Sequence, residues 1–102
     1  MMKYKKTQPV ISYQDFYNLA ESATSFKSLT GEFYDVISID DSTMNFVRKS
    51  SGEQWKMDLK GVHQAYLELN DFQTANFNPY VPRTHSPALG LLLYLGLLTN
   101  VD

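Results

Sequence analysis

The chain contains no cysteine and only two histidines, His63 and His85. The lack of cysteine excludes a disulfide framework, thiolate zinc sites and cysteine nucleophiles, and it fits a reducing compartment such as the cytoplasm, where we expect the protein. The histidines form neither an H-x-x-x-H nor an H-x-x-E-H pattern, so a metal site would need both of them with carboxylates that the fold brings close. We therefore expect no metal and no other cofactor.

Sequence motifs of catalysis are also missing. The five glycines are scattered, and neither G-x-G-x-x-G nor G-x-x-x-x-G-K-[ST] occurs, so no phosphate-binding glycine loop is expected. The nucleophile elbow G-x-S-x-G is absent as well. Glu53 and Lys56 resemble part of a nuclease motif in letters only, because in a strand they point to opposite faces. The sequence predicts a protein that is not an enzyme.

Long apolar runs and an excess of positive charge are lacking too. The strongest apolar run, 88–98, has 11 residues, whereas a bilayer span needs about 20. No apolar stretch follows the lysines of the first ten residues, so we expect neither a secretion signal nor a membrane partner. The formal net charge is −2, with 9 basic and 11 acidic side chains, which is not typical of a protein held to nucleic acid mainly by charge.

What is present suits one small core. A length of 102 residues with 43% apolar residues is typical of one folding unit. We expect a single α+β domain over 1–102, in which 1–11 is a partly flexible basic N-terminal segment. Three helices are predicted: 12–24, started by Ser12 and Asp15; a second from its cap Asp58 to about residue 70; and a last one that Ser86 caps and Gly96 ends.

The middle of the chain is typical of strands. Aromatic and β-branched residues fill 32–40, and two further strands, 43–49 and 53–58, flank a three-residue loop that ends in glycine. This loop predicts a register that pairs Lys49 with Glu53, Val47 with Trp55 and Asn45 with Met57; a slip by one residue would instead bring Trp55 opposite Phe46 or Arg48. With the helices the order is αβββαα, which favours a three-stranded, mainly antiparallel sheet with helices packed on it.

One segment offers a candidate binding site. Residues 78–87 bring Arg83, His85 and Ser86 next to the expected start of the last helix, where free backbone amides and the helix dipole attract anions. Arg83 adds a bidentate donor for phosphate or carboxylate. The alternative is that Arg83 pairs with an acid of the same domain and that Ser86 only caps the helix.

The last helix is apolar on all sides, so something must cover it. Either the long loop 71–86 wraps it or a second chain does, and an exposed apolar patch is a common sign of an interface. We expect Phe72 and Phe77 at least to close the core. We also expect a homo-oligomer or a protein partner, with an interaction surface drawn from these candidates: Phe77, Tyr80, Leu91, Leu92, Leu95 and Leu98.

Nucleic-acid binding is the alternative function. It would use a basic stripe of Arg48, Lys49, Lys60 and Arg83 beside the strand aromatics, because phosphate contacts and base stacking together bind single strands. Three lysines near the N-terminus, at positions 3, 5 and 6, with Tyr4 would extend the stripe. No helix-turn-helix or RNP-type motif supports this hypothesis.

Overall fold

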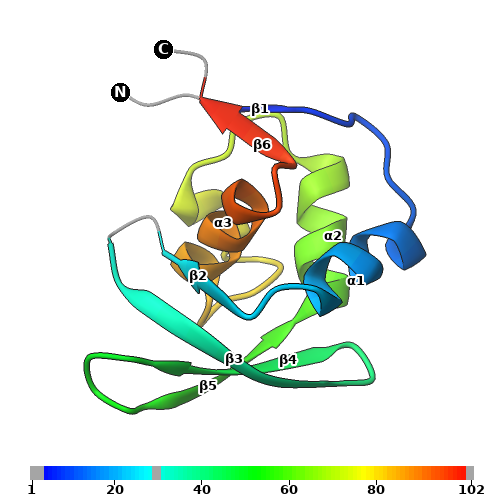
Figure 1. The fold of residues 1–102 in the computed structure, drawn as a ribbon. Coiled ribbons are helices and arrows are strands. Elements are labelled where there is room, and N and C mark those ends of the chain that lie inside the picture. Colours follow the sequence, from blue (N-terminus) through cyan, green and yellow to red (C-terminus); the bar gives the residue numbers. More distant parts are fainter. Residues whose placement is uncertain (1–3, 29–30, 101–102) are drawn as a thin grey trace.

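The computed structural model describes residues 4–28 and 31–100, whose strands form two antiparallel sheets (Figure 1). The four-stranded sheet has the order β2 (Ser25–Lys27), β3 (Phe33–Asp40), β4 (Thr43–Arg48) and β5 (Gln54–Asp58). The two-stranded sheet pairs β1 (Tyr4–Lys6) with β6 (Leu98–Asn100). The helices are α1 (Tyr13–Glu21), α2 (Leu59–Glu68), the 3-10 helix η1 (Thr74–Phe77) and α3 (His85–Tyr94).

The helices and the two-stranded sheet lie on one face of the four-stranded sheet, and no helix or strand of the described residues covers its other face (Figure 1). Phe33 and Ile37 of β3 are exposed on that open side. The core lies between the sheet and the helices, and its largest buried side chains include Tyr66, Phe16 and Phe46.

The predicted α+β class is confirmed, but the three-stranded sheet and the order αβββαα are wrong. The three strands that the sequence did not reveal, β1, β2 and β6, are each three residues long. Strands this short show too little alternation to be recognised, and tertiary pairing creates them instead. Tyr4–Lys6 also lie inside the segment 1–11, for which partial flexibility stays a prediction.

Local signals placed the starts of the first two helices correctly. The Ser12 side chain accepts a hydrogen bond from the Asp15 amide at 3.1 Å, and the Asp58 side chain accepts one from the Lys60 amide at 3.0 Å. Each bond satisfies an amide that has no partner inside its helix. The first helix ends at Glu21, earlier than the predicted residue 24.

The predicted register of the β4–β5 hairpin is wrong by one residue. Trp55 lies opposite Phe46, and Met57 lies opposite Met44. The loop has four residues instead of three, since the Gly52 amide donates to the Arg48 carbonyl and the Arg48 amide donates to the Glu53 carbonyl, both at 2.8 Å. This register puts the apolar side chains of both strands on the core face, which decides the pairing.

The start of α3 also differs from the prediction. The Ala88 amide donates to the Thr84 carbonyl at 2.8 Å, so Thr84 occupies the N-cap position and Ser86 lies inside the first turn. Pro87 is tolerated there because the first amides of a helix have no partner inside it. The predicted end is confirmed: Gly96 has a φ of +77°, which favours glycine.

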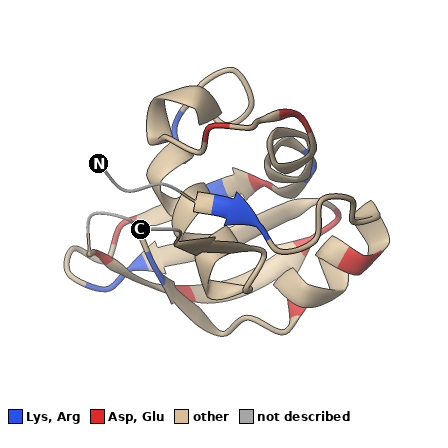
Figure 2. Ribbon diagram, turned by 90° about the horizontal axis from the view of Figure 1, so that it is seen from above, with Lys and Arg blue, Asp and Glu red and all other residues tan. Residues whose placement is uncertain are grey.

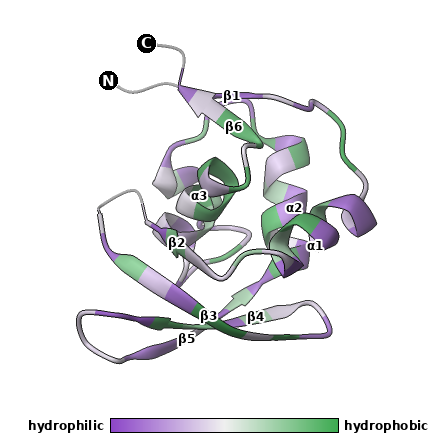
Figure 3. Ribbon diagram, viewed as in Figure 1, coloured by the Kyte–Doolittle hydropathy of each residue, from purple (hydrophilic) through white to green (hydrophobic). Residues whose placement is uncertain are grey.

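α3 is covered by the chain itself. It packs against β2 on one side and against η1 on another, and Figure 3 shows the strongly hydrophobic helix inside the molecule. Phe72 and Phe77 are buried, as expected for a loop that closes the core. The chain itself therefore buries residues 87–92 of α3, whereas Tyr94 near the end of the helix is exposed.

Candidate anion-binding pocket

A small pocket of about 200 Å³ lies between the start of α3 and the inner face of the sheet. Its lining comes from three strands, from the loop before α3 and from the first turn of α3. The lining residues are Tyr34, Arg48, Trp55, Arg83, His85, Ser86 and Pro87. We call this the α3 pocket. It unites all three anion-binding candidates with Arg48, a residue of the predicted basic stripe.

Arg48 lies at the end of β4, directly opposite Tyr34 in the register of the sheet. The neighbouring Tyr34 hydroxyl, acting as a hydrogen-bond acceptor, raises the pKa of Arg48 above its usual value, so the guanidinium stays charged. The Cζ atom of the guanidinium lies 5.9 Å from the centre of the Trp55 ring, within the range of a cation–π contact. Arg48 also forms an ion pair in which its Nη1 lies 3.8 Å from Glu53 Oε1, and such exposed pairs are weak.

The pocket gathers polar atoms that have no partner. Among the described residues, five buried side-chain polar atoms lack a hydrogen bond, and four of them belong to residues of this pocket. These four are Arg48 Nε, Trp55 Nε1, His85 Nδ1 and Ser86 Oγ. Leaving such an atom without a partner costs about 1–3 kcal/mol, and each case in a native protein calls for an explanation.

The backbone at the start of α3 adds further donors. The Thr84 side chain makes no capping hydrogen bond. The amides of His85 and Ser86 donate to no backbone carbonyl among the described residues. The first turn of α3 thus presents free amides and the positive end of the helix dipole beside the pocket.

This arrangement suits an anion. The pocket is lined by two arginines, one histidine and one serine, and no acidic side chain lines it. The unpartnered atoms are buried within the wall of the pocket. A carboxylate or a phosphate would supply the acceptors that the donors lack.

Sequence reasoning found one half of this site and missed the other. Arg83, His85 and Ser86 were predicted because they are neighbours in the chain. Tyr34 and Trp55 were missed because they come from separate strands, and no sequence signal connects them to the loop. The correct hairpin register places Trp55 opposite Phe46, on the same face of the sheet as Arg48. The signal for this register is Phe46, an apolar residue that favours the core face.

The other candidates lie apart from the pocket. Lys49 is exposed in the hairpin loop and Lys60 is exposed at the start of α2, and neither lines the α3 pocket. Figure 2 shows lysine and arginine on several separate elements with aspartate and glutamate between them. Lys3 lies outside the described residues. The predicted stripe is therefore not continuous over the part of the chain that is described.

The expected interaction surface is mostly internal. Phe77, Leu91, Leu92 and Leu98 are buried, so a partner cannot touch them without opening the core. The physical reason is that η1 and β2 of the same chain fill the space around α3. Tyr80 and Leu95 are half-buried, and the Tyr80 hydroxyl donates to Glu68 Oε1 at 2.8 Å.

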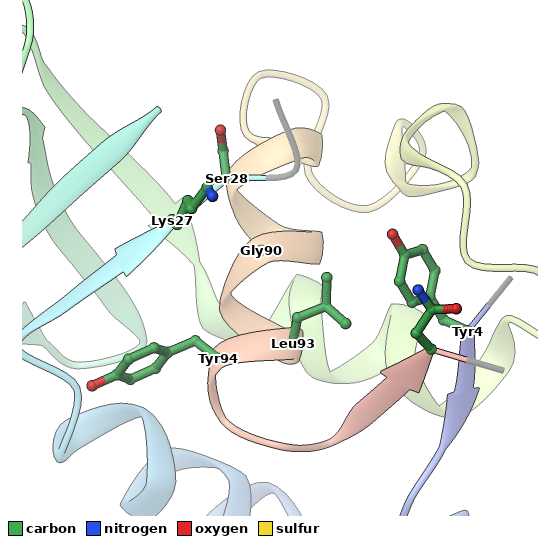
Figure 4. A pocket seen from close by; sticks show the side chains of 7 residues that line it. Tyr4, Lys27, Ser28, Gly90, Leu93 and Tyr94 are labelled. Atoms are coloured by element: carbon green, nitrogen blue, oxygen red, sulfur yellow. The ribbon is translucent and has the colours of Figure 1, made fainter. Parts of the chain in front are cut away.

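A second depression, of about 410 Å³, lies where β2 crosses α3 (Figure 4). Its walls come from α3, from β2 and from the strands at both chain ends, and they include Tyr4, Leu93 and Tyr94. It is larger than the α3 pocket, but none of the unpartnered buried atoms belongs to its lining. We therefore place the candidate site in the α3 pocket.

The described residues contain no group of three or more His, Cys, Asp or Glu side chains placed to hold a metal ion. Nor does any helix among them have the length and apolar content of a bilayer-spanning segment. Comparison with protein-family models, with curated proteins and with solved structures gave no significant match.

Proposed function

We propose that this protein is a non-catalytic binding domain that takes an anionic group of its partner into the α3 pocket. The observation that carries the proposal is that four unpartnered polar atoms belong to residues that line one cavity, and that two of its lining residues are arginines. Buried polar groups normally have partners, and donors without one gain most from a charged acceptor. His85 and Ser86 both line the pocket, but the Ser86 hydroxyl has no hydrogen-bond partner, so no base activates it as a nucleophile, which favours binding over catalysis.

The test uses Trp55, the single tryptophan of the chain, as a reporter in the pocket wall. Its indole N–H signal is followed by NMR while sodium phosphate, and separately sodium acetate, is added at constant ionic strength. We expect a saturable shift of this signal. Arg48→Ala should weaken the apparent affinity at least about tenfold, because the guanidinium supplies the strongest donor.

Lys49→Ala is the matched control, since it removes the same charge one residue away and outside the pocket. It should leave the titration unchanged. A linear, non-saturating response of the wild type would overturn the proposal, because it would show that the pocket binds no anion specifically. Equal losses of apparent affinity in the two variants would overturn it as well. Thermal unfolding of each variant checks that the fold is retained.

Nucleic-acid binding remains the second candidate because Arg48 and Arg83 lie beside the aromatic Trp55. It requires more than this pocket, since single-strand binding uses a basic track. A Lys49→Ala, Lys60→Ala double variant separates the two functions. Retardation of an oligonucleotide that falls steeply with salt and is lost in the double variant would favour nucleic acid.

A further inference from the structure

The strand next to the α3 pocket, β5, forms an edge of the four-stranded sheet. The bonds Arg48 N to Glu53 O and Leu59 N to Ser42 O fix which residues of β5 bond to β4. Trp55 and Met57 lie between Glu53 and Leu59 at intervals of two residues, so their backbone groups also face β4. The amides and carbonyls of the residues between them point away from β4, toward the open edge. Gln54 and Lys56 therefore present free backbone groups at the edge, and no backbone bond joins them to another segment of the described chain.

The opposite edge of the same sheet is closed. An ideal Cβ on Gly90 of α3 would lie 2.1 Å from the Lys27 carbonyl oxygen, so helix and strand are in direct contact there. A second strand cannot enter between them. Of the two edge strands of this sheet, only β5 is therefore placed to pair with an additional strand. Exposed sheet edges are templates for such strand addition.

A depression of about 310 Å³ lies beside the second half of β5. Lys56 and Asp58 of β5 form one side of it, and residues 80–84 form the other. Arg83 lines both this depression and the α3 pocket, so the two lie next to each other.

We propose that an extended peptide adds to β5 as an antiparallel strand and places its C-terminal carboxylate in the α3 pocket. The inference rests on the proposed function and names the partner: the free C-terminus of a protein. β5 runs from Gln54 toward Asp58, and Trp55 near its beginning lines the pocket. An antiparallel strand ends beside the beginning of β5, so its last residue arrives at Arg48, Arg83 and His85.

This mode combines two kinds of contact. Main-chain hydrogen bonds to Gln54 and Lys56 would supply affinity for any extended sequence, and the carboxylate would fix the register of the peptide. The pocket volume of about 200 Å³ has room for a carboxylate with a small part of the last residue. Tyr80 and Pro82 beside β5 offer apolar contacts to peptide side chains.

The experiment uses hexapeptides of randomised sequence, fixed to a surface through their N-termini. One array ends in free carboxylates, and its matched copy ends in carboxamides. We expect selected peptides to bind as carboxylates and to bind at least about tenfold more weakly as carboxamides. Equal binding to both arrays, or binding to neither, overturns the inference.

Amide hydrogen exchange tests the strand with a selected peptide. Gln54 and Lys56 amides should become protected when the peptide binds, while the amides of Ser25 and Lys27 at the closed edge should not change. Lys56→Pro removes an outward amide that the sheet does not use, so the fold should survive. This variant should lose peptide binding while Lys56→Ala keeps it.

The outcomes separate the two proposals. If phosphate and acetate still shift the Trp55 signal saturably but no peptide binds, the pocket is an anion site and only the strand inference fails. If the ions give no saturable shift, the proposed function fails first. Peptide binding that Lys56→Pro abolishes but Arg48→Ala leaves unchanged would support strand addition and contradict the carboxylate site.

Discussion

The two ends of α3 differ in how their polar groups are satisfied. At the C-terminal end, the Gly96 amide donates to the Leu93 carbonyl at 3.1 Å and the Leu97 amide donates to the Leu92 carbonyl at 3.0 Å. These two bonds form a Schellman motif. The carbonyl of Leu97 accepts a further bond from the buried Tyr66 hydroxyl at 2.9 Å. This end of the helix is closed.

The N-terminal end has the opposite character. No side chain caps it, and His85 Nδ1 and Ser86 Oγ have no partner. Both ends belong to one ten-residue helix whose middle is buried. The closed end therefore stabilises the fold, and under the proposed function the open end would supply donors to the anion.

Gly90→Ala should give the largest effect, because it displaces the whole helix and so disturbs both ends. The added Cβ would lie 2.1 Å from the Lys27 carbonyl oxygen and 2.7 Å from Ser28 Cα, and both contacts are with backbone. We expect a loss of about 3 kcal/mol or more in the free energy of unfolding, measured by urea denaturation. A loss below about 1 kcal/mol would contradict the close contact between β2 and α3.

The sequence predicted those elements that depend on interactions between neighbouring residues, and it missed those that depend on pairing between distant segments. Ser12 and Asp58 were assigned correctly because a helix cap needs only an amide two or three residues away. The strands β1, β2 and β6 arise from pairing between distant segments, and three residues carry no usable pattern. α3 was predicted as apolar on all sides, which indicates a buried helix as readily as an interface.

The hairpin shows why local charge could not decide the register. The predicted pair, Lys49 with Glu53, and the observed pair, Arg48 with Glu53, both join opposite charges. Burial decides instead, because only the observed register turns Met44 and Met57 together into the core. Because of the same error in register, the sequence did not predict that Arg48 and Trp55 line the α3 pocket together.

Tyr66→Phe tests the closed end and should give the next largest effect. The Tyr66 hydroxyl lies near the Gln8 carbonyl at 2.7 Å as well as that of Leu97, and the Gln8 amide donates to it at 3.3 Å. Phenylalanine would leave these groups buried with fewer partners. We expect a loss of about 1–3 kcal/mol in urea denaturation. An unchanged midpoint would show that the closed end does not depend on this hydroxyl.

The same residue predicts a pH dependence. Burial raises the pKa of Tyr66 above its ordinary value of 10.0, so the folded protein holds this proton more tightly than the unfolded chain. The free energy of unfolding should therefore fall as the pH rises above about 10. Tyr66→Phe removes this contribution, so the difference between wild type and variant should shrink on the alkaline side. Burial also raises the pKa of Tyr13, which both proteins share.

Gly96→Ala should cost less than either change. The added Cβ meets nothing within 4 Å, but the φ of +77° disfavours alanine. We expect a loss of about 1 kcal/mol from backbone strain alone. Comparison with Gly90→Ala separates strain from a clash within one helix, and equal losses at the two positions would contradict that separation.

Ser86→Ala at the open end should give the smallest effect on stability. The Ser86 hydroxyl makes no hydrogen bond, so its removal should change the free energy of unfolding by less than about 0.5 kcal/mol or raise it. The matched control is Ser12→Ala, which removes a serine whose side chain caps α1 at 3.1 Å and should cost about 1 kcal/mol. A loss at Ser86 as large as that at Ser12 would mean that the hydroxyl already has a partner in the free protein. The start of α3 would then be as closed as its end, and the α3 pocket would have one donor fewer to offer.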